Sequence, residues 1–245
     1  MIFITGDTHG NIDNDKLRKF VLQHPNLSKK DYVLIAGDFG GVWSEQTLQQ
    51  DLAFYKALPC TVLFVDGNHE NHDLLNRFPV TRWKRGKVHR ISSNIIHLMR
   101  GQVFELPGES GSIAIATLGG GDSRDKEFRR EGKSWWAAER ITDADVEEFI
   151  RSVKAYPGRI DYCVTHAPSI DVTIQLYNRS FKHSPYGNPR YYPENCPSDY
   201  LVREAILASG IKPRCIFSGH QHLDEEFKLY GQRHRLLFND FVKIG

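Results

Sequence analysis

The chain has 245 residues, with 32 Lys and Arg against 30 Asp and Glu, and 40% of its residues are hydrophobic. This length is ample for one sizeable core, and the ordinary apolar content excludes wholesale disorder. The net charge of +2 is too small to indicate a nucleic-acid partner by itself. No apolar run approaches the roughly 20 residues of a membrane helix. We therefore expect one soluble domain spanning residues 1–245, without a membrane partner.

The first ten residues, MIFITGDTHG, contain neither the basic nor the apolar region of a signal peptide. The four cysteines show no clustered spacing. Three of them, Cys60, Cys163 and Cys215, lie in or beside apolar runs, where free cysteine behaves as a small buried hydrophobic residue. We therefore expect a reduced, cytoplasmic protein.

Short β-branched runs alternate with amphipathic helical patterns, which is typical of an α/β architecture. Strands are predicted at residues 2–5, 32–36, 61–65, 113–117, 162–165 and 215–218. Further short strands joined by tight turns are expected across 87–117 and 225–239. Two packed sheets with helices outside them accommodate all of these elements.

Helix boundaries are indicated by capping residues and breakers. A serine N-cap predicts a helix over 44–59, and a Thr-x-x-Asp capping box predicts one over 142–157 that stops at Pro-Gly. A third helix is predicted over 198–210, closed by glycine. Glu70 is expected to cap a short helix over 71–76.

Two long segments, 119–140 and 177–197, match no regular element, and loops of this length are usually lids or binding loops. Arginines in the first, Arg124 among them, alternate with acidic residues, so its net charge is nearly neutral. The second contains Tyr186 among several aromatics and two arginines, which can stack a base or an aryl ester beside a phosphate. Arg124 and Tyr186 are thus candidate substrate contacts, and packing of the aromatics against the domain is an equal alternative.

Five predicted strands run into groups that contain Asp, Asn or His. These groups are GDTH, GD, GNHE, a single His and GHQH, in chain order. The carboxyl ends of strands form the usual ligand site of α/β sheets, and glycine allows close backbone approach there. Together the loops would bring seven metal ligands to one rim: Asp7, His9, Asp38, Asn68, His166, His220 and His222.

These ligands offer oxygen and nitrogen without cysteine, a set that suits hard or borderline divalent cations. Mn is expected first, and Fe, Zn, Ni and Co also suit the set. Seven ligands are too many for one tetrahedral zinc and suit two metal ions that share a carboxylate. Such a centre clamps both oxygens of an in-line phosphoryl displacement and generates hydroxide at neutral pH.

In this order and over nearly the whole chain, D-x-H, GD, GNHE, a lone His after a strand and G-H-x-H resemble the motifs of the calcineurin-like metallophosphoesterase superfamily. The resemblance implies a four-layer αββα sandwich with the metal site at the carboxyl ends of the strands. The ligand sets that it implies are Asp7, His9 and His222 for one metal, Asn68, His166 and His220 for the other, and Asp38 bridging both.

His69 is similar to the histidine of this superfamily that contacts the phosphoryl group and assists the leaving group. The resemblance therefore implies a catalytic role for His69, and substrate contacts for Asn68 and His69. The protein serine/threonine phosphatases extend the second motif to G-D-x-x-D-R-G, whereas here Phe-Gly-Gly-Val follows Asp38. The Asp that would orient His69 and the Arg that would grip phosphate are missing from that place. Segments such as NHENHDLLNRFPV and SWWAAE instead resemble a bacterial and phage branch.

The sequence thus predicts a dinuclear metal-dependent phosphoesterase that hydrolyses phosphate mono- or diesters by attack of a metal-bound hydroxide. A nuclease acting on DNA or RNA is the main alternative, supported by the basic stretch 76–90, which is otherwise a solvated face. A non-catalytic metal-binding scaffold is less favoured, because every ligand and His69 are retained. His72 is close enough to His69 in sequence to be a candidate for lining the site, and the oligomeric state is left open.

Overall fold

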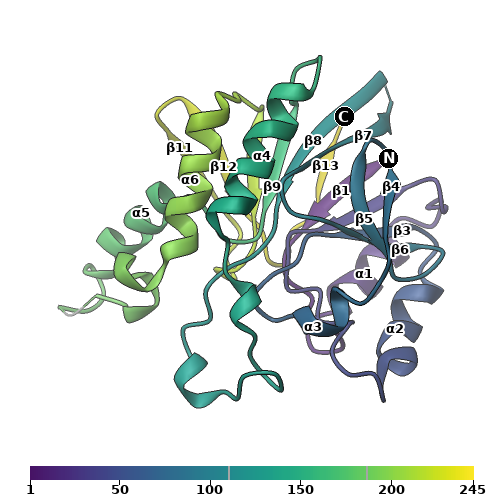
Figure 1. The fold of residues 1–245 in the computed structure, drawn as a ribbon, viewed down its shortest axis with the longest axis horizontal. Coiled ribbons are helices and arrows are strands. Elements are labelled where there is room, and N and C mark those ends of the chain that lie inside the picture. Colours follow the sequence, from purple (N-terminus) through teal and green to yellow (C-terminus); the bar gives the residue numbers. More distant parts are fainter. Residues whose placement is uncertain (110, 186) are drawn as a thin grey trace.

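The computed structural model of the protein describes residues 1–109, 111–185 and 187–245. Two β-sheets pack face to face, and helices cover the outer face of each (Figure 1). This is the four-layer αββα sandwich that the sequence predicts.

Seven strands form the first sheet. In spatial order they are β13 (Val242–Ile244), β1 (Ile2–Thr5), β2 (Tyr32–Ile35), β3 (Thr61–Phe64), β6 (Ile95–Leu98), β5 (Gly86–Arg90) and β4 (Val80–Trp83). The helices on its outer side are α1 (Asp15–Gln23), α2 (Leu48–Ala57) and α3 (His72–Leu75). Side chains along β1 alternate between the two faces of the sheet, so Ile2 and Ile4 pack between the sheets while Phe3 packs toward the helices.

Six strands form the second sheet. In spatial order they are β11 (Glu225–Leu229), β12 (Gln232–Leu236), β10 (Cys215–Ser218), β9 (Tyr162–Thr165), β8 (Gly111–Leu118) and β7 (Gln102–Gly108). The helices on its outer side are α4 (Asp143–Ala155), α5 (Ile170–Ser180) and α6 (Pro197–Ser209). Phe149 of α4 and Val202 of α6 are buried against Cys163 and Ile216 of the sheet.

Parallel pairing determines where the functional loops lie. Strands β1, β2 and β3 are mutually parallel, and so are β8, β9 and β10. The carboxyl ends of each set therefore lie at one edge of its sheet. The two termini of the chain lie side by side, because Ile2 of β1 pairs with Ile244 of β13. Within the residues just described, no helix has both the length and the apolar character needed to span a membrane.

The predicted elements are present, with two differences. The predicted capping box of α4 is confirmed, because Thr142 and Asp145 bond to each other's backbone N–H. Helix α2 begins at Leu48, four residues later than expected from Ser44, whose hydroxyl bonds to Gln46 instead. Helix α5 extends to Ser180, so the start of the 177–197 segment is helical and not a loop.

Candidate metal centre

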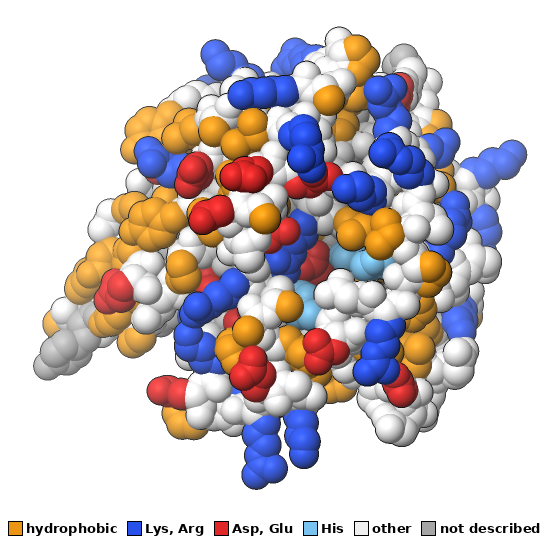
Figure 2. All heavy atoms as spheres, in the orientation of Figure 1, with side chains coloured by type: hydrophobic (Ala, Val, Ile, Leu, Met, Phe, Trp, Pro, Cys, Tyr) orange, Lys and Arg blue, Asp and Glu red, His pale blue; other side chains and the backbone are white. Residues whose placement is uncertain are grey.

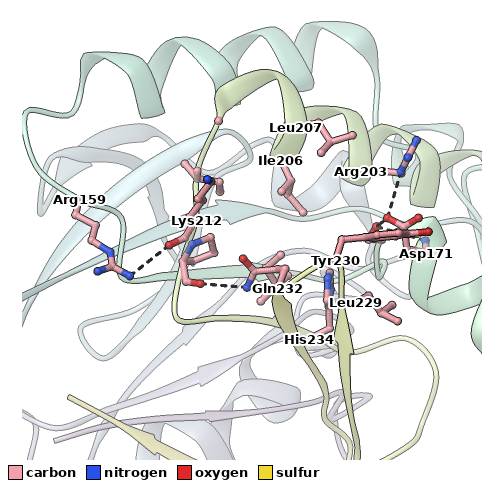
Figure 3. A pocket seen from close by; sticks show the side chains of 16 residues that line it. Arg159, Asp171, Arg203, Ile206, Leu207, Lys212, Leu229, Tyr230, Gln232 and His234 are labelled. Atoms are coloured by element: carbon pink, nitrogen blue, oxygen red, sulfur yellow. Dashed lines mark hydrogen bonds and ion pairs between the residues drawn. The ribbon is translucent and has the colours of Figure 1, made fainter.

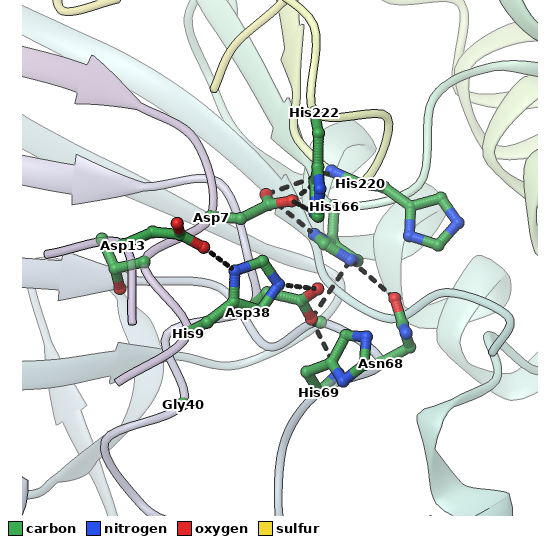
Figure 4. Close-up of polar contacts among 12 residues, drawn as sticks. Asp7, His9, Asp13, Asp38, Gly40, Asn68, His69, His166, His220 and His222 are labelled. Carbon is green, nitrogen blue, oxygen red and sulfur yellow. Dashed lines mark hydrogen bonds and ion pairs between the residues drawn. The ribbon is translucent and has the colours of Figure 1, made fainter. Parts of the chain in front are cut away.

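Loops at the carboxyl ends of five strands converge at one place (Figure 4). Following β1, β2, β3, β9 and β10, they carry Asp7, His9, Asp38, Asn68, His69, His166, His220 and His222. One ligand atom from each of four residues lies within 4.8 Å of the others, and these four are Asp7, His9, Asp38 and His222. The structure therefore brings together side chains that are up to 215 positions apart (222 − 7) in the chain.

The carboxylate of Asp38 faces two groups of side chains. Its Oδ2 lies 3.2 Å from Nε2 of His9, and its Oδ1 lies 3.3 Å from Nε2 of His166. The same His166 nitrogen is 3.0 Å from Oδ1 of Asn68, and the His220 ring packs edge-on against the His166 ring. Asp38 is thus between the Asp7–His9–His222 side and the Asn68–His166–His220 side.

Burying the two carboxylates of this centre costs free energy unless cations lie close to them. Asp7 is fully buried and Asp38 is 1% exposed, and buried carboxylates require positive partners. Burial alone would raise the pKa of Asp38, but His166, His69 and His9 hold it well below its ordinary value. Burial and the nearby Arg124 hold the pKa of His220 well below its ordinary value, which keeps the imidazole neutral as a metal ligand must be. Carboxylate and amide oxygens with neutral imidazoles fit divalent metal ions.

Neighbouring groups select the ring nitrogen that faces the centre. Nδ1 of His166 donates to the carbonyl of Ala36 at 2.9 Å, and Nδ1 of His9 lies 2.7 Å from Oδ2 of Asp13. In both rings Nε2 is therefore left free toward Asp38. The sequence does not distinguish Asp13 as a site residue, because one acidic residue in a turn has no characteristic pattern.

Four candidate ligands have left-handed backbone conformations: φ is 43° at His9, 48° at Asp38, 66° at His220 and 54° at His222. Such conformations cost about 1–3 kcal/mol each and persist where surrounding contacts enforce them. Here the N–H groups of Thr8 and His9 both donate to the Asp38 carbonyl, at 3.0 and 2.8 Å. Strain concentrated at these positions is typical of functional sites.

Glycines allow the carboxylates to approach the backbone closely. A Cβ atom at Gly67 would lie 2.1 Å from Oδ1 of Asp38, and one at Gly219 would lie 2.1 Å from Oδ1 of Asp7. No side chain fits at either position without displacing a candidate ligand.

Glu70 supports the turn that follows Asp38. It is fully buried, and its two carboxylate oxygens accept hydrogen bonds from the N–H of Phe39 at 2.7 Å and of Gly40 at 3.2 Å. The expectation that Glu70 caps the following helix is wrong, because Asn71 caps α3 by accepting from Leu74 N at 2.9 Å. A buried carboxylate is stabilised better by these N–H donors than by an exposed helix end.

A chain of side chains fixes the orientation of Asn68. Its Nδ2 donates to Oγ of Ser123 at 3.1 Å, and that hydroxyl donates to Oε2 of buried Glu139 at 2.7 Å. The amide oxygen of Asn68 is thereby left facing His166. Ser123 and Glu139 belong to the 119–140 segment, so this loop contacts a candidate ligand of the site.

His69 contacts a cation from the same loop. Its backbone N–H donates to Oδ1 of Asp38 at 2.7 Å, and its ring lies edge-to-face with that of His9. The Arg129 guanidinium lies against the ring, with NH1 3.1 Å from Nδ1 and NH2 3.4 Å from Nε2. Arg129 also pairs with Asp125 at 2.7 Å. An arginine therefore lies beside His69 although none follows Asp38 in sequence, and the alternating charges of its loop give no indication of this contact.

The three remaining candidate substrate contacts have different outcomes. His72 faces away from the centre: its Nε2 lies 3.1 Å from the carbonyl of Gly67, in a separate polar cavity of about 390 Å³. Arg124 borders the His220–His222 loop, with NH2 3.4 Å from Oε1 of Gln221. Tyr186 lies outside the residues that the structure describes.

The centre opens to solvent on one side. The side chain of His222 is 35% exposed and that of His9 is 12% exposed, whereas His166 is fully buried. Figure 2 shows one face of the molecule, on which Lys and Arg side chains are interspersed with acidic and hydrophobic ones. A substrate would therefore approach along the His9–His222 side.

Another cavity lies away from this centre, between α6 and the β11–β12 hairpin (Figure 3). Its volume is about 590 Å³, and its lining includes Leu207, Tyr230 and the Arg203–Asp171 ion pair. All of its lining residues lie outside the predicted site.

Metal-dependent hydrolysis of phosphate esters is the activity for which this fold and these side chains are suited. A family model described as calcineurin-like phosphoesterase matches residues 1–224. The chain therefore belongs to that family and is a metal-dependent phosphoric ester hydrolase. No curated protein sequence matches the chain significantly.

Solved structures share the fold at low sequence identity. A phosphopantetheinyl hydrolase from Mycobacterium tuberculosis is 15% identical with a TM-score of 0.53, and the match covers 97% of this chain and 89% of the hydrolase chain. A putative 5′-nucleotidase from Staphylococcus aureus is 12% identical with a TM-score of 0.51, and the match covers 97% of this chain and 48% of that one. The GAP50 anchor of the Plasmodium inner membrane complex is 9% identical with a TM-score of 0.51, covering 97% and 70%. At these identities the likeness establishes the fold alone.

Proposed function

We propose that the protein hydrolyses small phosphate mono- or diesters at a centre of two divalent metal ions. The observation that carries the proposal is the position of Asp38, whose two carboxylate oxygens face different groups of ligands. Asp38 would contact both metals. The groups on its two sides would be Asp7, His9 and His222 for one metal, and Asn68, His166 and His220 for the other.

When bound, two such ions, Mn²⁺ first with Fe, Zn, Ni and Co as alternatives, would supply Lewis acidity and a nucleophile at neutral pH. The chain's own residues handle the other parts of the reaction. Arg129, whose guanidinium lies against the His69 ring, would contact a phosphoryl group there through charge-assisted hydrogen bonds. His69, beside it, would donate a proton to the departing oxygen. Asn68, held by Ser123, presents its amide oxygen to the centre.

Small esters are favoured over nucleic acid because acidic residues neutralise much of the basic stretch 76–90. Arg85 lies 3.6 Å from Glu105, and Lys87 lies 3.0 Å from Glu148. Arg77 also pairs with Glu45. The names of two structural neighbours, a phosphopantetheinyl hydrolase and a putative nucleotidase, also favour esters of small molecules. All four cysteines are buried free thiols, which supports a cytoplasmic location.

The fold also occurs in a protein described as an anchor, so catalysis has to be tested directly. Purified protein saturated with Mn²⁺ is assayed against phosphate monoesters, diesters, nucleotides and oligonucleotides, and its metal content is measured by elemental analysis. We expect two metals per chain and turnover of small esters. A metal content that plateaus at one in fully folded protein would refute the two-metal centre. Turnover of oligonucleotides alone would instead identify a nuclease.

The proposed role of His69 has a test of its own. His69→Ala should retain two metals and lose about 10²–10⁴-fold in rate with phenyl or alkyl phosphates, whose basic leaving groups need a proton. With p-nitrophenyl phosphate the loss should be clearly smaller, because nitrophenolate leaves unaided. The comparison requires metal-saturated enzyme with chemistry rate-limiting. Equal losses would mean that His69 positions the phosphoryl group and is not an acid.

A further inference from the structure

Two arginines outside the metal motifs meet at the His220–His222 loop. NH2 of Arg190 donates to the carbonyl of His220 at 2.8 Å, and NH2 of Arg124 donates to Oε1 of Gln221 at 3.4 Å. Arg190 belongs to the short 3₁₀ helix Pro189–Tyr191, and Arg124 comes from the 119–140 loop. The sequence predicts both segments on the substrate side, and each contributes a cation beside a candidate ligand loop.

Neither guanidinium has a carboxylate within ion-pair distance among the residues described here. Two acidic residues of this region, Asp122 and Asp199, are engaged elsewhere. Asp122 accepts from the N–H of Ser198 at 2.7 Å and faces Arg140, while Asp199 accepts from Thr173. Two partly buried arginines without counter-charges are unusual, because buried charges are normally paired.

Three buried N–H groups at this place have no hydrogen-bond partner within the described parts of the chain: Nε of Arg124, Nε of Arg190 and Nε2 of Gln221. Buried donors in native proteins are nearly always satisfied, so exceptions point to a bound ligand, ion or water. The donors belong to one cluster, since Arg124 bonds to Gln221 and Arg190 bonds to the carbonyl of the preceding residue, His220.

An anion between the two guanidinium groups would supply the counter-charge that neither has within ion-pair distance in the described parts of the chain.

We propose that Arg124 and Arg190, with Gln221, bind a second phosphate group of the substrate, next to the phosphate held at the centre. Two guanidinium groups and an amide N–H suit a tetrahedral dianion with several acceptor oxygens. The substrate class is then a small molecule with two phosphates. This inference rests on the proposed function, and the neighbouring phosphate of an oligonucleotide offers the same chemistry from another source.

The test is calorimetric titration of the Mn²⁺-loaded protein with adenosine 5′-monophosphate and adenosine 3′,5′-bisphosphate. We expect the bisphosphate to bind about 10- to 100-fold more tightly. Arg124→Gln and Arg190→Gln should each remove most of this preference, weakening the bisphosphate far more than the monophosphate. Arg190→Lys should restore part of it. Arg130→Gln, an exposed arginine of the same loop, is the matched control and should keep the preference.

Equal affinity of the wild type for both nucleotides would overturn the proposal, and so would variants that weaken both equally. A six-residue oligothymidylate titrated in parallel identifies the source of the second phosphate. Arginine-dependent binding of this oligomer without a preference for the bisphosphate would overturn the assignment to a small molecule. Binding does not require turnover, so absence of hydrolysis with the preference intact would refute the proposed function and not this site.

Discussion

Ser123 holds the orientation of one candidate metal ligand, Asn68, and can be replaced without changing any ligand. Its hydroxyl accepts from Nδ2 of Asn68 at 3.1 Å and donates to Oε2 of Glu139 at 2.7 Å. Replacing Ser123 with alanine removes both bonds without altering any candidate ligand. The Asn68 amide then loses the contact that determines which of its atoms faces His166. An amide turned over would present N–H₂ to the centre, and an N–H₂ group does not bind a cation.

Two magnitudes follow from this arrangement. Loss of a residue that holds a metal ligand in place typically costs about 10–100-fold in metal affinity or activity. We therefore expect Ser123→Ala to weaken the metal on the Asn68 side by about that factor and to leave the other unchanged. Glu139 keeps the N–H of Ser123 as a donor at 2.7 Å but loses the hydroxyl. A partly unsatisfied buried carboxylate should lower the free energy of unfolding by about 1–3 kcal/mol.

The assay is calorimetric titration of metal-free protein with Mn²⁺, which resolves two sites of unequal affinity. Ser123→Thr keeps the hydroxyl and should restore the weaker site. Ser134→Ala is the matched control, because its hydroxyl bonds to the N–H of Arg130 within the same loop, at 3.0 Å. If Ser123→Ala binds both metals like the wild type while remaining folded, the reasoning about Asn68 is refuted.

Three further changes test other parts of the structure. Asp38→Asn should reduce kcat with p-nitrophenyl phosphate at saturating Mn²⁺ more than His9→Ala, because Asp38 faces both ligand groups; equal losses would contradict that position. Gly67→Ala places a Cβ 2.1 Å from the Asp38 carboxylate, so chemical denaturation should show a loss of about 1–3 kcal/mol together with weaker metal binding. Burial raises the pKa of Asp199 from 3.8 to about 7, so the stability linked to this group is full below about pH 4 and is lost as the pH rises through about 7. In urea unfolding, the free energy of unfolding of Asp199→Asn should therefore rise relative to that of the wild type by about 3 kcal/mol between about pH 5 and pH 8. The same pH dependence in both proteins would exclude the raised pKa.

The parts of this molecule that the sequence predicts are those encoded locally. Each of the five strands that precede the candidate ligands has four residues, most of them apolar or β-branched, and the first candidate ligand follows within four positions. Parallel strands then bring their ends to one edge without further information. For this reason the sequence alone predicts that residues as distant as Asp7 and His222 lie together, and the structure confirms that they do.

The supporting contacts could not be predicted because they join residues with no shared local pattern. Glu70 reaches Phe39 across 31 positions, and Asn68 reaches Ser123 across 55. In sequence, Glu70 stands before a helix and therefore resembles a cap. Its actual role depends on the turn after Asp38 lying directly beside it, which only tertiary packing determines.

The 119–140 loop shows why metal motifs alone do not determine the choice of substrate. It supplies Ser123 to one ligand, Arg129 to the ring of the proposed acid and Arg124 to the ligand loop after β10. Arg100 holds the end of this loop, donating to three successive backbone carbonyls at 2.7–3.0 Å. In the proposed reaction the five candidate ligand loops would determine where the reacting phosphate binds, whereas this one loop would set the charge around it. Two proteins with the same metal ligands and different versions of this loop should therefore act on different phosphate esters.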